Sequence, residues 1–185
     1  MSGPDISITN ITADDITEFR GLLATLSDGD ITVIRVGVDD TDYIARLADN
    51  PELRWIARAS GDDGAPGPII GYATVNRLPG WSDHVGELRL VVDPQQRGTG
   101  LGRRLVQHAL RAAVAAGMSK VMVELTTDSD AVVDLFTSLG FTGEALLRDH
   151  IRDHHGQLRD LLVLAHHVGQ TWDTLSTIGV ADALA

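Results

Sequence analysis

The chain has 185 residues, of which 43% are hydrophobic and 22% charged, so we expect one domain over residues 1–185. Its 15 basic and 26 acidic residues give a formal net charge of -11, which argues against nucleic acid or an anionic membrane as a partner. The absence of cysteine excludes disulfides, thiolate nucleophiles and cysteine-ligated metals. No segment is apolar for long enough to cross a bilayer, and the start lacks the pattern of a secretory leader, so we expect a cytoplasmic protein.

The first eighty residues carry alternating and helical patterns but no motif. Apolar residues alternate with polar ones where we expect strands, and Thr12 precedes the apolar positions of a helix that it caps. Glycines and prolines at 61–68 indicate a long turn between two strands of a hairpin. The expected order is a strand at 6–8, the helix after Thr12, a loop at 27–42, a helix at 43–47, and strands at 53–60 and 69–76.

The second half contains the clearest helical pattern. Apolar residues recur at three- and four-residue spacing from Leu101 to Val114, and Gly117 follows where a left-handed cap is usual. The remaining expected elements are strands at 87–92, 121–125, 141–148 and 161–165, a helix at 131–139, a polar connection at 149–160, and a C-terminal tail at 168–185. This order predicts a mixed α/β (α+β) fold around a single sheet.

A glycine- and arginine-rich loop at 95–104 joins a strand to this helix. Its glycines allow tight turns that point backbone N–H groups toward an anion at the helix start, although a plain glycine turn with solvated arginines is the alternative. A Walker loop is excluded because no lysine follows Gly102, and a dinucleotide loop because Arg103 replaces its last glycine. The loop therefore predicts another kind of pyrophosphate site. Its glycines and arginines are Gly98, Gly100, Gly102, Arg97, Arg103 and Arg104.

The stretch Arg97-Gly98-Thr99-Gly100-Leu101-Gly102 resembles the Arg/Gln-x-x-Gly-x-Gly/Ala signature of the GNAT superfamily of acyl-CoA N-acyltransferases. The segment Leu90–Pro94 before it, and Leu139-Gly140-Phe141 after it, are similar to further hallmarks of that superfamily. The segment 156–164 is similar to the closing hairpin of the ribosomal-protein N-terminal acetyltransferase branch. The resemblance covers about residues 87–141 and this hairpin.

The resemblance implies a mostly antiparallel sheet that splays at two adjacent parallel strands to admit acetyl-CoA as co-substrate, with no metal. The backbone of Leu90, Val91 and Val92 would hold the pantetheine and polarise the thioester carbonyl. The residues that it implies for the pyrophosphate are Arg97, Gly98, Thr99, Gly100, Leu101, Gly102 and Arg103. Ser129 and Phe136 occupy further positions that line the cofactor in the family. Ser129 replaces the asparagine usual there, and we expect Phe136 to pack beside the pantetheine or in the core.

Transfer to an amine requires a base, because an amine with a pKa near 10.4 is charged at neutral pH. Glu124 stands at the position of the base in the N-terminal acetyltransferase branch, and Glu87 near the position that other branches use. We favour Glu124 by this resemblance, and a plain solvated carboxylate is the alternative for each. Phe136 replaces the tyrosine that often protonates the thiolate. A thiol of pKa about 8.5 leaves without a strong acid, so water can protonate the departing thiolate.

The sequence therefore predicts an N-acetyltransferase that acts by direct attack of an amine on acetyl-CoA. The acceptor is open among a peptide N-terminus or lysine, an amino acid, a polyamine and an aminoglycoside, with a tilt toward a peptide amine. A catalytically weak or inactive coenzyme A-binding sensor or scaffold is the alternative. The histidines at 150–167 lack a distinctive metal-ligand spacing, so we expect no metal there. A homodimer is compatible with the sequence.

Overall fold

The computed structural model describes residues 6–27, 29, 30, 44, 47, 51–60, 66–127, 130–153 and 155–168. The loop and helix expected over 27–47 fall mostly outside these residues. Ser129, His154 and the tail from 169 also lie outside them.

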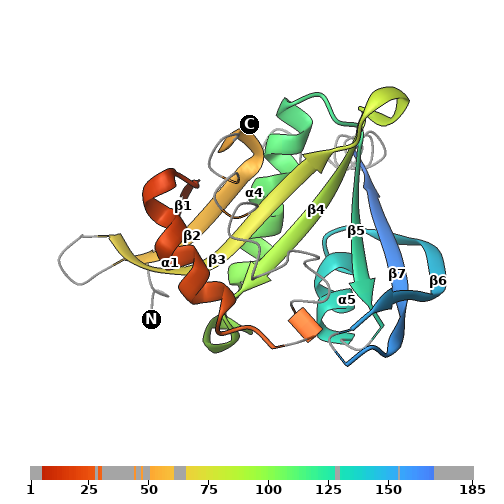
Figure 1. Cartoon of the computed structure of the whole chain (residues 1–185). Helices are drawn as coiled ribbons and strands as arrows, with labels where there is room; N and C mark the ends of the chain where they lie inside the picture. The colour runs from red at the N-terminus through yellow and green to blue at the C-terminus, as the bar shows by residue number, and fades with distance from the viewer. Residues whose placement is uncertain are drawn as a thin grey trace.

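The described residues form one seven-stranded sheet with the strand order β1-β2-β3-β4-β5-β7-β6 (Figure 1). Neighbouring strands are antiparallel except β4 and β5, which are parallel. This confirms the predicted mixed fold with a single parallel pair inside an antiparallel sheet. The strands are β1 (Ile6–Asn10), β2 (Arg54–Ser60), β3 (Pro66–Arg77), β4 (Val85–Val92), β5 (Lys120–Thr126), β6 (Thr142–Arg152) and β7 (Leu158–His167).

Helices cover both faces of the sheet (Figure 1). On one face lie α4 (Leu101–Ala115) and α5 (Asp130–Thr137), and on the other lies α1 (Ile16–Leu23), which follows the single turn η1 (Ala13–Asp15). The described residues also include short turns of 3-10 helix, namely η3 (Pro51–Leu53), η4 (Gly80–Ser82) and η5 (Pro94–Gln96). Gly117 has φ +81° just after α4, as expected for its cap. None of the helices described is long and apolar enough to span a membrane.

Each face of the sheet has its own core. Leu105, Val106 and Ala109 of α4 are fully buried against the central strands, and the same cluster extends to Phe136 and Phe141. On the opposite face Phe19 and Leu23 of α1 pack with residues of β2, β3 and β4, and the rings of Phe19 and Tyr72 lie 4.7 Å apart. The predicted apolar stripe of α4 is thus the face that meets the sheet.

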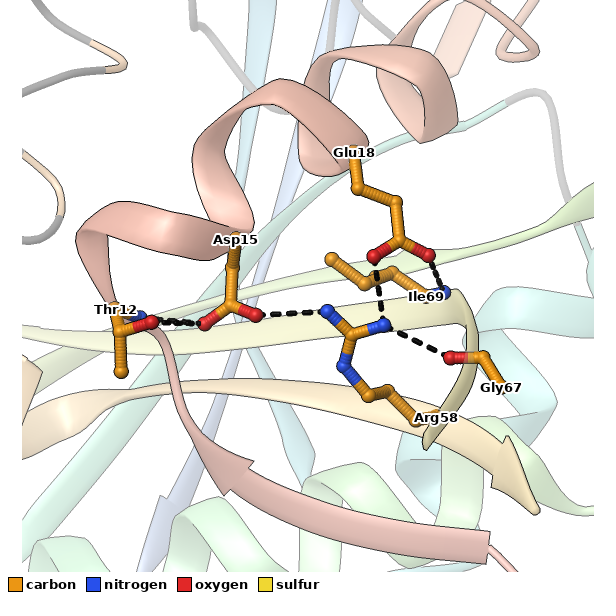
Figure 2. Close-up of polar contacts among 6 residues, drawn as sticks. All are labelled: Thr12, Asp15, Glu18, Arg58, Gly67 and Ile69. Atoms are coloured by element: carbon orange, nitrogen blue, oxygen red, sulfur yellow. Dashed lines mark hydrogen bonds and ion pairs between the residues drawn. The ribbon is translucent and has the colours of Figure 1, made fainter. Parts of the chain in front are cut away.

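One arginine fixes α1 to the hairpin of β2 and β3 (Figure 2). Arg58 of β2 donates from Nη2 to Asp15 at 2.7 Å, and from Nη1 to Glu18 at 2.6 Å and to the carbonyl of Gly67 at 2.8 Å. Glu18 also accepts the backbone N–H of Ile69 at 2.8 Å. Burial raises the pKa of Asp15, but hydrogen bonds from Thr12 and Arg58 outweigh it and leave the pKa below its ordinary value.

The final hairpin is longer than predicted. The polar residues expected as a connection over 149–160 belong mostly to β6 and β7, and the register continues with Ile151 opposite Arg159. The prediction failed because these strand ends are largely exposed and need no apolar residues. Asp149 has φ +51° at a break in the register, where its N–H donates to the side chain of Asp160 at 2.9 Å.

Candidate active site

The parallel pair β4 and β5 separates after only three residue pairs. Val85, Gly86 and Glu87 pair with Lys120, Val121 and Met122, and the ladder ends there although both strands continue. The last five residues of β4 therefore pair with β3 alone. A sheet that opens between two central strands can admit an extended ligand between them.

The register of β4 decides which of its backbone groups face this opening. Leu78 N–H donates to the Val85 carbonyl at 2.9 Å, and Asp93 N–H donates to the Ile70 carbonyl at 3.0 Å. The backbone N–H and C=O groups of odd-numbered residues in β4 thus point toward β3, and those of even-numbered residues point toward β5. Of the three residues predicted to hold pantetheine, Leu90 and Val92 face the opening, whereas the backbone of Val91 is used within the sheet.

The glycine loop leads from β4 into the N-terminus of α4. Gly98 and Gly100 have φ of +76° and +88°, and a side chain at either would meet no atom within 4 Å. The positive φ therefore favours glycine at both positions. Among the residues that the structure describes, no atom fills the space outside the loop where a side chain would stand. Gly102 has another reason, because an added Cβ would lie 3.2 Å from Leu135 of α5. The first turn of α4 carries no acidic residue, so nothing there opposes an anion at the helix start.

The three arginines of the loop each contact a protein group. Arg97 pairs with Asp30 at 2.8 Å, Arg103 donates to the hydroxyl of Ser138 at 2.7 Å, and Arg104 donates to the carbonyl of Ile6 at 2.9 Å. All three belong to the loop that the sequence predicts as a pyrophosphate site. Arg104 instead ties α4 to β1, and the exposed Arg97 and Arg103 remain at the loop.

The two predicted glutamates lie on the strands that border the opening. Glu87 pairs with Met122 in the last rung, and Glu124 follows Met122 by two residues, so both face the side of the sheet opposite α4. Arg89 donates from Nε and Nη2 to Glu87 at 3.1 Å. Sequence reasoning missed Arg89, although opposite charges two residues apart on one strand share a face and were a readable signal.

Phe136 lies in the core at 1% exposure, edge to face with Phe141 at 5.0 Å between ring centroids. Its contact with the cofactor stays a prediction. In the part of the chain that the structure describes, no three histidine or acidic residues come together as a metal site. His166 is buried beside Phe141, and burial first, then the charge of His167, lower the pKa of His166.

The family model described as "Acetyltransferase (GNAT) family" matches residues 24–141, which is more than half of the chain. The fold described above is therefore that of an acetyltransferase. Its sheet opens between two parallel strands, beside a glycine loop at the start of a helix. The chain belongs to the GNAT family.

Individual relatives agree with this family. The N-alpha-acetyltransferase RimI of Mycobacterium tuberculosis is 34% identical over 104 residues, which are 56% of this chain and 61% of the relative. The mycothiol acetyltransferase of Rhodococcus opacus is 31% identical over 153 residues, which are 82% of this chain and 45% of the relative. The chain therefore spans less than two thirds of the length of these relatives.

Solved structures share the fold at low sequence identity. The ribosomal-protein-alanine N-acetyltransferase of Brucella melitensis superposes with a TM-score of 0.68 at 19% identity, covering 87% of this chain and 99% of that one. The yncA protein of Salmonella typhimurium, solved with its cofactor acetyl-CoA, gives 0.70 at 20% identity, covering 89% and 94%. At this identity the likeness extends to the fold alone.

Proposed function

We propose that this chain is an N-acetyltransferase that binds acetyl-CoA between β4 and β5 and transfers the acetyl group directly to an amine. The observation that carries the proposal is the early end of the β4–β5 ladder, five residues before the end of β4 and between the strands that carry both glutamates. The glycine loop follows the end of β4 and leads into α4. Even-numbered backbone groups of β4 point into this opening, and the loop has space for phosphates outside Gly98 and Gly100.

Acetyl-CoA supplies a thioester whose carbonyl carbon bonds to the acceptor nitrogen as the carbon–sulfur bond breaks and the thiolate departs. In our proposal the backbone N–H groups of Leu90 and Val92 bind the pantetheine arm and polarise the thioester carbonyl. The N–H groups from Gly98 to Arg103 bind the pyrophosphate at the start of α4. The proton released by the amine nitrogen passes to Glu124, and water protonates the thiolate because Phe136 has no donor.

Of the two glutamates, Glu124 is the better candidate for the base. Arg89 donates to Glu87 from two nitrogens, so the Glu87 carboxylate is engaged in an ion pair on its own strand. Glu124 lies one strand away on the same face, and its Oε2 is buried. We therefore assign Glu87 the role of orienting Arg89 and Glu124 the role of general base.

For the acceptor, we propose a peptide amine, and in particular an N-terminal one. The support is the name of the RimI relative, an N-alpha-acetyltransferase, together with the extended β6–β7 hairpin that borders β5. We also propose that residues 1–185 act as one domain in the cytoplasm, with a homodimer as the assembly to test.

Calorimetric titration of acetyl-CoA, coenzyme A and ATP tests the binding step. We expect saturable binding of both coenzyme A species and none of ATP, with binding lost in Gly100→Glu. Gly80→Glu is the matched control, since Gly80 has φ +65°, open space around it, and a place at the opposite end of β4. Loss of binding in both variants, or in neither, contradicts the assignment of the loop.

Thiol release with a panel of amines tests the transfer step. We expect release that depends on the acceptor and is fastest with peptides that carry a free N-terminal amine. Tight binding of acetyl-CoA without release for any amine favours the second candidate, a coenzyme A-binding sensor or scaffold. The buried Phe136, which has no proton to donate, is the observation that keeps this candidate in view.

A further inference from the structure

An ion pair joins the phosphate loop to a segment 67 residues earlier in the chain. Arg97, the first residue of the loop signature, donates from Nη2 to Oδ2 of Asp30 at 2.8 Å. Asp30 follows α1 in the chain, and α1 lies on the face of the sheet opposite α4. Neither the composition of the loop nor its glycine spacing indicates an acidic partner there.

Asp30 is held in place without help from Arg97. The same oxygen, Oδ2, accepts the N–H of Ser27 at 3.1 Å and its hydroxyl at 2.6 Å, and the Ser27 hydroxyl in turn accepts the N–H of Asp30 at 3.3 Å. Burial raises the pKa of Asp30, but hydrogen bonds from Ser27 and Arg97 outweigh it and leave the pKa below its ordinary value. A fixed negative charge therefore stands beside the loop at neutral pH.

Arg97 is the movable partner of this pair. Its side chain is 50% exposed, against 29% for that of Asp30, and a long side chain at a surface has many rotamers. Exposed ion pairs contribute at most about 1 kcal/mol, and arginine forms charge-assisted bonds of matching geometry with a phosphate as it does with a carboxylate. A phosphate bound at Gly98, the next residue along the chain, competes with Asp30 at short range.

We propose that Asp30 is an internal competitor of the cofactor's phosphates for Arg97, which limits the affinity for coenzyme A and so favours its release after transfer. Arg97 leaves Asp30 for a phosphate oxygen when the cofactor binds and returns to Asp30 when coenzyme A departs. Ser27 keeps Asp30 charged and in position throughout. This inference rests on the proposed binding of acetyl-CoA. It adds Asp30, a residue outside the loop, as a determinant of the affinity for coenzyme A.

Asp30→Asn tests the inference, because asparagine keeps an oxygen for the Ser27 donors and removes the charge. We expect coenzyme A and acetyl-CoA to bind about fivefold more tightly by calorimetry, with slower release of coenzyme A, as removal of a surface charge pair of about 1 kcal/mol implies. The gain shrinks as salt is raised because the competing charges are exposed. Acetyl-pantetheine, which has the thioester arm without pyrophosphate or adenosine, shows the same KM in both proteins.

Asp14→Asn is the matched control, since it removes one exposed negative charge from η1 and leaves the loop unchanged. The double variant Arg97→Gln with Asp30→Asn shows no gain over Arg97→Gln alone if the two residues act as a pair. Unchanged or weaker coenzyme A binding in Asp30→Asn overturns the inference, and so does an equal gain for acetyl-pantetheine or in Asp14→Asn. Failure of every coenzyme A species to bind the wild type overturns the proposed function itself, which separates the two failures.

Discussion

Replacing Arg58 by methionine removes the cation that holds α1 to the hairpin of β2 and β3 and keeps much of the apolar stem. Its side chain is 15% exposed, and those of Asp15 and Glu18 are 14% and 42% exposed. Removing one member of a buried pair costs about 3–5 kcal/mol, and an exposed pair contributes about 0–1 kcal/mol. With one partner buried and the other half exposed, we expect the free energy of unfolding to fall by about 2–3 kcal/mol.

Urea unfolding followed by circular dichroism measures this loss, and thermal unfolding should show Tm lower by about 4–12 °C. Because the pKa of Asp15 is lowered in the fold, its stabilisation is complete above about pH 4 and is lost as the pH falls through the lowered value. The variant should lose part of this acid dependence. Arg148→Met, an exposed change on β6, is the control, and an equal loss in both variants would refute the reasoning.

Three further predictions concern catalysis, pH and packing. Glu124→Gln should lower kcat by about 10²–10⁴-fold with acetyl-CoA affinity unchanged, and Glu87→Gln should lower it less, as stopped-flow thiol release would show. The lowered pKa of His166 means that the unfolded chain takes up the proton first, so stability in urea should fall below about pH 6.5, and less in His166→Gln. Gly71→Ala would place Cβ 2.8 Å from Leu105 and cost about 1–3 kcal/mol, whereas Gly21→Ala, in open space on α1, should stabilise by about 0.5–1 kcal/mol.

Much of the fold could be predicted because local patterns and tertiary packing agree. The apolar stripe of α4 coincides with the face that is buried, and β5 alternates strictly between buried and half-buried residues. Thr12, which the sequence assigned as the cap of the first helix, instead caps η1, the single turn before α1, in a capping box with Asp15. The polar ends of β6 and β7 could not be predicted, because a strand whose residues are exposed carries no alternation.

Less of the candidate site than of the fold could be predicted from the sequence. Its glycines carry a local signal, since φ and close packing are properties of single positions. The partner of Arg97 lies 67 residues away, and the direction of each β4 amide depends on the register with β3. Both depend on contacts between segments far apart in the chain, and the spacing of residues along one strand gives no information about such contacts.

Because β4 and β5 pair over only three rungs, the sheet consists of two parts with little backbone pairing between them. Strands β1–β4 form one ribbon and β5–β7 another, and beyond those rungs the two ribbons are held together by the shared core under α4 and α5. Amide hydrogens at the rungs should therefore exchange with solvent sooner than those in the middle of either ribbon. A ligand lying along the opening would bridge the ribbons as an added strand does, and slower exchange at Gly86 and Met122 would record how firmly it joins them.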